Sequence, residues 1–256
     1  MKKDRLQRIV IDLQSRRELS TQDACGLYGA SEATIRRVFN ELAASGLAVR
    51  THGGIRVPEK QAAPSIPYVL RETWNADEKR LIAKEAVKLI QPGQTVMLYG
   101  GSTTEPLGSF LNDCRVITNF PGLCRILRLR FPTGDGPEVI LTGGQLNYRT
   151  GLLEGPIPRR VLENYRGDIG FSSSFGMDET GLLDISDECS EQIALMLGKS
   201  AVRVILADHT KFGRKSFCRC VPWDKVHILI TVFDAGNRNF YKAIRDKGVK
   251  IIFAKA

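Results

Sequence analysis

The segment from Ser31 to Gly46 reads Ser-Glu-Ala-Thr-Ile-Arg-Arg-Val-Phe-Asn-Glu-Leu-Ala-Ala-Ser-Gly and carries the clearest structural signal in the chain. Ile35, Phe39 and Leu42 recur at spacings of four and three residues, which predicts a helix with one apolar face. Ser31 is suited to cap the N-terminus of this helix, and Gly46 is suited to end it in the left-handed conformation. The sequence therefore predicts a short amphipathic helix with sharply marked ends.

The opposite face of this predicted helix carries side chains that suit DNA. Arg36, Arg37 and Asn40 lie off the apolar stripe, where they can reach phosphates and base edges. Ser31 and Thr34 are expected to help fix the helix on the DNA backbone. If Arg36 reads a guanine, Arg36→Ala should cost roughly 1–3 kcal/mol and relax specificity at one base, whereas uniform weakening would indicate a phosphate contact.

The neighbouring segments complete a winged helix-turn-helix. Apolar residues at 6, 9, 10 and 13 predict a first helix over about 5–15, and Thr21 is expected to cap a second over about 22–28. The segments 48–50 and 55–57 can pair as strands around a glycine-bearing turn. Arg50, His52 and Gly53 are predicted to support this wing against DNA. Gly53-Gly54 also suits a plain hairpin turn, and the two interpretations are compatible.

The charge of the chain agrees with a polyanionic partner. The formal net charge is +9. Residues 1–60 hold 11 Lys and Arg against 7 Asp and Glu, whereas the remaining 196 residues hold 26 against 21. Positive charge is therefore denser at the N-terminal end, which favours a nucleic-acid-binding module there. Simple solubility is the plainer explanation of the same excess.

Several classes of protein are disfavoured by the sequence. It has no run of about 18 uncharged apolar residues, so we expect no membrane span. Charged residues flank Ile9-Val-Ile11, so the N-terminus lacks the apolar core of a signal peptide and we expect a cytoplasmic location. Six cysteines form no Cys-x-x-Cys pair, and the three histidines share no ligand spacing with them. We therefore expect reduced thiols, no metal site, no cofactor and no catalytic residues.

The chain divides at a segment rich in proline. Pro58, Pro64 and Pro67 indicate a linker, so the predicted domains are a winged helix-turn-helix over 1–57, a linker over 58–67 and an α/β effector-binding domain over 68–256. In the second domain Asp77 is expected to cap a helix reaching about Ile90. Strands are predicted at 95–98, 115–117, 138–141, 169–172, 202–207, 226–230 and 249–253, and helices after 104, after 121 and at 157–164, 189–199 and 238–247. This alternation predicts a Rossmann-like, mostly parallel sheet covered by helices.

Small and polar residues follow the predicted strands, at the sheet edge where ligands of such folds bind. Gly100 and Gly101, leading into a helix, are expected to offer backbone N–H groups to an anion, and Lys211 a point charge. Asp178, Glu188 and Asp208 are expected to accept from sugar hydroxyls. The further candidate effector-binding residues are Ser102, Thr103, Thr104, Thr118, Asn119, Gly143, Gly144 and Gly176. A plain turn explains each glycine pair equally well, but together these loops favour a small, polyhydroxylated, anionic ligand.

Over nearly its whole length the chain resembles the DeoR family of bacterial transcriptional regulators. The motifs that carry the resemblance are Thr34-Ile-Arg-Arg37, Arg50-Thr-His-Gly-Gly54, Gly101-Ser-Thr-Thr104, Thr118-Asn119, Thr142-Gly-Gly144, Gly176-Met-Asp178 and Asp208-His-Thr-Lys-Phe-Gly213. The resemblance implies a winged helix-turn-helix that binds double-stranded operator DNA as a homodimer or homotetramer. It also implies an effector domain similar to the sugar-phosphate isomerase and CoA-transferase fold, a phosphorylated sugar or polyol effector, and repression of a catabolic operon.

The chain departs from the family pattern at two positions. Val38 stands where the family usually has Asp after its paired arginines, and Tyr99 stands where it usually has Asp before the Gly-Ser-Thr-Thr loop. We expect an Asp at 38 to lie near the arginines and orient them, so Val38 is expected to alter operator choice or binding strength. Tyr99 replaces a carboxylate suited to hold a ligand hydroxyl, which indicates a different effector or a different binding pose.

Two other functions remain open from the sequence. A sugar-phosphate isomerase or transferase with a vestigial N-terminal module is one alternative, in which Asp208, Lys211 and Glu188 would move protons. It is disfavoured because the sequence shows no close carboxylate pair and an isomerase has no use for residues 31–56. An N-terminal module that binds a protein instead of DNA is the other, and DNA binding that is weak and independent of salt would support it.

Overall fold

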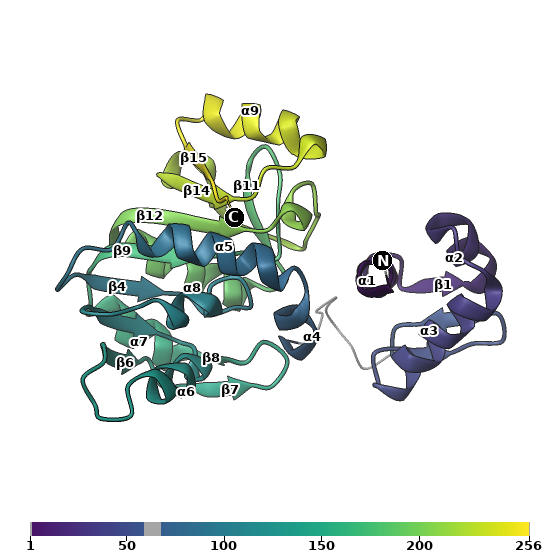
Figure 1. The fold of residues 1–256 in the computed structure, drawn as a ribbon, viewed down its shortest axis with the longest axis horizontal. Coiled ribbons are helices and arrows are strands. Elements are labelled where there is room, and N and C mark those ends of the chain that lie inside the picture. The colour runs from purple at the N-terminus through teal and green to yellow at the C-terminus, as the bar shows by residue number, and fades with distance from the viewer. Residues whose placement is uncertain (1, 59–67, 256) are drawn as a thin grey trace. The chain divides into compact units, whose positions relative to one another are not determined.

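The computed structural model describes residues 2–58 and 68–255, and it divides after Trp74 into two compact units (Figure 1). The predicted linker falls, apart from Pro58, outside the described residues, so the domain boundaries drawn from the sequence stay predictions. Among the described helices, none has the length and apolar character needed to cross a membrane.

The N-terminal unit is a three-helix motif with a small sheet. Its helices are α1 (Lys2–Arg16), α2 (Thr21–Tyr28) and α3 (Glu32–Ala44), and a short helix α4 (Tyr68–Thr73) follows later in the chain. The antiparallel sheet has the order β1-β3-β2, with β1 (Glu18–Ser20), β2 (Val49–Arg50) and β3 (Gly54–Arg56). Ile35, Phe39 and Leu42 are buried, as the apolar stripe predicted. The winged helix-turn-helix is therefore confirmed.

The ends of these helices follow the capping chemistry of the sequence, with one correction. Ser31 Oγ accepts from the backbone N–H of Thr34 at 3.4 Å, and Gly46 has a φ of +72°, so both predicted ends of α3 are confirmed. The cap of α2 is Ser20, whose Oγ accepts from Asp23 N at 3.0 Å, and not Thr21. Thr21 N instead donates to Gly53 O at 2.8 Å, which ties the wing turn to the start of α2.

The C-terminal unit is built on a seven-stranded parallel sheet of order β15-β14-β12-β9-β4-β5-β6. Its strands are β4 (Thr95–Leu98), β5 (Arg115–Thr118), β6 (Glu138–Leu141), β9 (Gly167–Ser172), β12 (Ser200–Ala207), β14 (Ile228–Thr231) and β15 (Lys250–Phe253). Its helices are α5 (Ala76–Val87), α6 (Pro121–Arg130), α7 (Pro156–Glu163), α8 (Asp187–Gly198) and α9 (Arg238–Asp246). The α/β class and the parallel sheet are confirmed.

Short strands outside the main sheet escaped the sequence analysis. The hairpin of β7 (Gln145–Asn147) and β8 (Leu152–Glu154) follows β6. A second antiparallel sheet has the order β10-β11-β13, with β10 (Gly176–Met177), β11 (Gly181–Asp184) and β13 (Cys218–Pro222). These strands have two to five residues, so they are too short to show a clear alternation of apolar and polar side chains. The second sheet packs against α8, and the hairpin lines a cavity together with Glu188 at the start of α8.

Two helix predictions in this unit need correction, one in the type of helix and the other in its N-terminal cap. The Gly100–Thr104 loop leads into a five-residue 3₁₀ helix, η1 (Glu105–Ser109), and not into an α-helix. Pro106 and Gly108 explain the short element, because both are poor residues for a helix interior. Helix α5 begins at Ala76, preceded by Asn75 with a φ of +51°, so Asp77 lies in the first turn instead of capping the helix.

Candidate DNA interface and candidate effector site

The predicted DNA-binding residues surround a cleft in the N-terminal unit. The cleft has a volume of about 510 Å³ and lies between α2, the start of α3 and the wing; its lining residues are Thr21, Gln22, Cys25, Glu32, Arg36, Arg50, His52 and Gly53. Arg36, Arg50, His52 and Gly53 are therefore brought together. Ser31, Arg37 and Asn40 are exposed on α3, with Thr34 half-buried. Gln22 and Glu32 were missed, because nothing in their local spacing links them to the wing.

The cleft arginines differ in how they are held. Arg50 Nη1 donates to Gly54 O at 3.2 Å, and its guanidinium lies 5.7 Å from the centre of the Phe39 ring. Arg50 thus fastens the wing to α3. Arg36 instead contacts Glu32, one turn earlier on α3, with Nε 2.9 Å and Nη2 2.6 Å from Glu32 Oε1.

Val38 lies in the core of the unit and not among the arginines. Its exposed fraction is 6%, and it shares the buried face of α3 with Ile35 and Phe39. Val38 itself therefore does not contact DNA, and the expectation that an Asp at this position would orient the arginines stays a prediction. Valine suits the position because it needs no hydrogen-bond partner there, unlike a buried carboxylate.

The Gly-Ser-Thr-Thr loop is structured by internal hydrogen bonds. Gly100 N donates to Asn119 Oδ1 at 3.0 Å, and a Cβ on Gly100 would lie 2.4 Å from Phe120 Cβ. Thr104 Oγ1 donates to Tyr99 O at 2.8 Å, and Thr103 is buried. The prediction that Gly100 offers a free N–H at the start of an α-helix is therefore wrong, because the amide is already bonded and the helix is η1.

A pair of buried lysines lies at the carboxyl edge of the sheet, around Asp208. Lys79 on α5 is 3% exposed and its Nζ donates to Ser102 Oγ at 3.1 Å. Lys211 is 7% exposed and its Nζ donates to Ser174 O at 2.8 Å. Burial raises the pKa of Asp208, but the charges of Lys211 and Lys79 and hydrogen bonds from Thr210 outweigh it, so the pKa lies below its usual value. Sequence reasoning missed Lys79, which sits in an ordinary amphipathic helix.

Glu188 lies on a cavity of about 340 Å³ between the β7–β8 hairpin and the start of α8. The lining residues are Gln145, Leu146, Asn147, Glu154, Gly155 and Glu188. Burial opposes ionisation of Glu188, but hydrogen bonds from Gln192 and Gly155 and the charge of Arg159 lower its pKa below the usual value. Of the predicted effector-binding residues, Glu188 is the one that lines this cavity.

A chain of buried hydrogen bonds joins this cavity to the Gly-Ser-Thr-Thr loop. Gln192 Nε2 donates to Glu188 Oε1 at 2.9 Å, and Asn119 Nδ2 donates to Gln192 Oε1 at 2.9 Å. Asn119 Oδ1 in turn accepts from Gly100 N at 3.0 Å. Asn119 and Gln192 are fully buried. The cavity and the loop are therefore connected by hydrogen bonds.

The other predicted effector residues serve the fold around the site. Thr118 Oγ1 accepts from Phe120 N, and Gly143 and Gly144 have φ values of +68° and +117° in the turn before β7. Asp178 Oδ1 accepts from Thr180 and Gly181 and so closes the β10–β11 turn. A Cβ on Gly176 would lie 2.0 Å from Arg214 O. These contacts give the residues structural roles, as the sequence also allowed for Gly143-Gly144, and their binding of an effector stays a prediction.

Tyr99 is buried at the end of β4. Burial raises its pKa well above the usual value, and Cys189, Asp184 and Glu154 add to the effect. The phenol is therefore neutral and lies near Glu154, a wall of the cavity. All six cysteines are unbridged, and no group of three or more potential ligands suited to a metal ion lies within residues 2–58 and 68–255.

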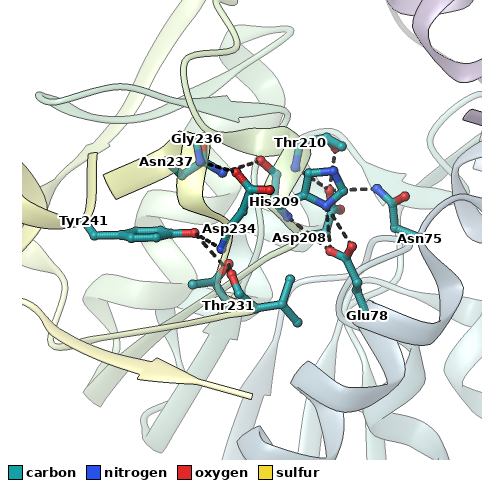
Figure 2. A network of polar contacts seen from close by, with 11 residues as sticks. Asn75, Glu78, Asp208, His209, Thr210, Thr231, Asp234, Gly236, Asn237 and Tyr241 are labelled. Carbon is teal, nitrogen blue, oxygen red and sulfur yellow. Dashed lines mark hydrogen bonds and ion pairs between the residues drawn. The ribbon is translucent and has the colours of Figure 1, made fainter. Parts of the chain in front are cut away.

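A second polar network lies beside Asp208 (Figure 2). His209 Nδ1 is 2.8 Å from Glu78 Oε1, on the residue next to Lys79, and Asn237 Nδ2 donates to His209 O at 2.8 Å. Asn75 Nδ2 donates to Asp208 Oδ1 at 3.1 Å. The network thus connects α5, the loop after β12 and the loop before α9.

The His209–Glu78 contact makes stability depend on pH. The hydrogen bond to Glu78 raises the pKa of His209 against the effect of burial. Its stabilisation is therefore complete below about pH 6.5, the unfolded value, and is lost as pH rises through the folded pKa. We expect the melting temperature of His209→Gln to fall below that of the natural protein at pH 5.5 and to approach it at pH 8.

His227 provides a control with the opposite sign. Burial and the charge of Arg203 lower its pKa. The neutral form is favoured in the folded state, so this residue destabilises the fold as pH falls below about 6.5. The melting temperature of His227→Gln should therefore rise relative to that of the natural protein at pH 5.5. Parallel pH trends in the two variants would contradict both assignments.

The two units match two family descriptions. Residues 5–61 match a DeoR-like helix-turn-helix domain, and residues 74–232 match a DeoR C terminal sensor domain. The chain is 33% identical to the HTH-type transcriptional regulator GlpR of Haloferax volcanii, over 98% of this chain and 96% of that protein. It is 28% identical to the glycerol-3-phosphate regulon repressor of Escherichia coli K12, over 77% of this chain and 78% of that one. A solved ribose 5-phosphate isomerase A from Methanocaldococcus jannaschii superposes with a TM-score of 0.38 and 22% identity, over 55% of this chain and 56% of that one.

Proposed function

Because this chain belongs to the DeoR family of transcriptional regulators, we propose that it represses a carbohydrate-catabolism operon and releases its operator when a phosphorylated sugar or polyol binds. The N-terminal unit binds DNA through α3 and the wing. We further propose that it acts in the cytoplasm as a homodimer or homotetramer, because two-fold assemblies match symmetric half-sites.

The buried lysine pair is the observation that carries the effector proposal. Two lysines at the carboxyl edge of a parallel sheet lie close enough to the buried Asp208 for their charges to lower its pKa. Two ammonium groups at this edge, one of them hydrogen-bonded to the Ser102 hydroxyl, suit a phosphate group. Cofactors and catalytic steps are not needed for this role.

The cavity at Glu188 suits the hydroxyl-bearing part of the same ligand. Glu188 and Glu154 supply carboxylate oxygens and Asn147 and Gln145 supply amides, which together accept from and donate to hydroxyl groups. The volume of about 340 Å³ is within the range of small-molecule sites. Ligand binding there is coupled to the loop by the Glu188–Gln192–Asn119 hydrogen bonds.

The first experiment measures binding of the purified chain to a duplex that it enriches from a randomised pool, against a scrambled duplex. Phosphosugars and sugar alcohol phosphates are added singly, with each unphosphorylated sugar beside them. We expect preferential binding that one phosphorylated compound releases. Binding without preference would contradict the repressor, and turnover of a phosphosugar would favour the isomerase-like alternative.

Glu188→Gln tests the effector site with a matched control. Arg159 contacts both Glu188 and Glu191, at 3.3 and 2.5 Å, but only Glu188 lines the cavity. Glu188→Gln removes a charged hydrogen-bond partner of the ligand. The affinity of this variant for the releasing compound should therefore fall by about 10- to 150-fold. Glu191→Gln should respond as the natural protein does, and both variants should keep DNA binding. Equal responses in the two variants would remove Glu188 from the site.

A further inference from the structure

We infer that Glu32 gives the paired arginines different contacts with DNA: Arg36 reads a base edge in the cleft, and Arg37 neutralises a phosphate. The inference rests on the DNA-binding function proposed above. It assigns Glu32 as a positioning residue for base recognition, through the guanidinium of Arg36.

The contact geometry leaves one edge of Arg36 open for a base. Nε and Nη2 contact Glu32 Oε1, at 2.9 and 2.6 Å. A guanidinium has five N–H donors, so the edge formed by Nη1 and the second proton of Nη2 remains for another acceptor. That edge presents two parallel N–H groups, which can donate to O6 and N7 of a guanine.

The charge of Glu32 favours a base over a phosphate. A phosphate at Arg36 would place two anions on the same guanidinium, and their repulsion strengthens as DNA displaces water from the cleft. The O6 and N7 acceptors of guanine carry no net charge, so Glu32 can keep its contact when Arg36 reaches them. Both side chains are more than half exposed, at 63% and 60%, so the pair contributes little to folding stability and its role is orientation.

Arg37 is placed differently on the same helix. It is exposed, does not line the cleft, and makes no hydrogen bond or ion pair with another residue of the described N-terminal unit. With no acidic partner to oppose a second anion, it is suited to a phosphate. Arg50 also lines the cleft, but its guanidinium is bonded to Gly54 O and lies near the Phe39 ring, whereas Arg36 keeps an edge that its contact with Glu32 does not use.

The test compares Glu32→Gln with Glu41→Gln in the full chain. Glu41 is exposed on α3 and makes no ion pair among the described residues, so both variants lose one negative charge from the same helix. The probe is the duplex that the natural protein enriches from a randomised pool, together with all its single-base substitutions. Affinities are measured from 50 to 200 mM salt, and melting temperatures check that both variants fold.

We expect Glu32→Gln to lose discrimination at one base pair, where the natural protein discriminates by roughly 5- to 150-fold. The slope of the logarithm of its DNA affinity against the logarithm of salt concentration should steepen by about 0.9, because Arg36 becomes a phosphate contact. Glu41→Gln should change neither quantity. Identical behaviour of the two variants would overturn the assignment of Glu32, whereas a natural protein without sequence preference would overturn the proposed function itself.

Discussion

Replacing Asp208 by Asn is expected to destabilise the C-terminal unit by about 3–5 kcal/mol at pH 7. The substitution keeps the shape of the side chain but removes the carboxylate that lowers the charge density around Lys79 and Lys211, which are 3% and 7% exposed. Two buried ammonium groups then lose the carboxylate charge that both of them feel, while their hydrogen bonds to the neutral Ser102 Oγ and Ser174 O remain. Urea unfolding of the full chain measures the loss.

Asp178→Asn is the matched control for this prediction. Asp178 is also a predicted effector residue, but its carboxylate closes the β10–β11 turn and is only partly buried. The same change there should cost about 1 kcal/mol, the size of one ordinary hydrogen bond. A loss below about 1 kcal/mol for Asp208→Asn would mean that the lysines do not depend on this carboxylate, contrary to the charge cluster described above.

The pH dependence of Asp208→Asn gives an independent check. The pKa of Asp208 is lower in the folded chain than in the unfolded chain, whose value is about 3.9. Its stabilisation is therefore complete above about pH 4 and is lost as pH falls through the folded value. The difference between the natural protein and Asp208→Asn should stay constant from pH 7 to about pH 5 and shrink only in stronger acid.

Gly54→Ala is expected to cost the N-terminal unit about 3 kcal/mol and to abolish specific DNA binding. An added Cβ would lie 2.2 Å from Leu19 O and 2.9 Å from Ser20 Cα, both backbone atoms of the neighbouring strand β1. Strand β3 would have to move away from β1, and the wing would move with it, since the Arg50 guanidinium is bonded to Gly54 O. Hydrogen exchange of the full chain should show loss of protection confined to β1–β3.

Gly53→Ala separates the close contact from the glycine pair as such. No atom lies within 4 Å of a Cβ built on Gly53, so this substitution should change stability by less than about 0.5 kcal/mol. Both variants remove one glycine from the same turn, and they differ only in the space around the new methyl group. Equal losses would show that the turn, and not the approach of β3 to β1, requires glycine.

Elements with local signals could be predicted from the amino-acid sequence. The stripe of Ile35, Phe39 and Leu42 and the ends at Ser31 and Gly46 specify α3, because helix periodicity and capping involve residues within a few positions of one another. The alternation of strands and helices specified the parallel sheet in the same way. The family motifs lie in these elements and in the loops between them, so class and family were both accessible.

The contacts between polar groups that are distant in the chain became visible in the folded structure. Lys79 and Asp208 are distant in the chain, and so are Gly100, Asn119 and Gln192. Periodicity reports which way a side chain faces and not its partner, so Lys79 looked like any helix residue and Gly100 looked free to bind an anion. Burial makes these contacts important for stability, because a charge removed from water needs a partner within the fold.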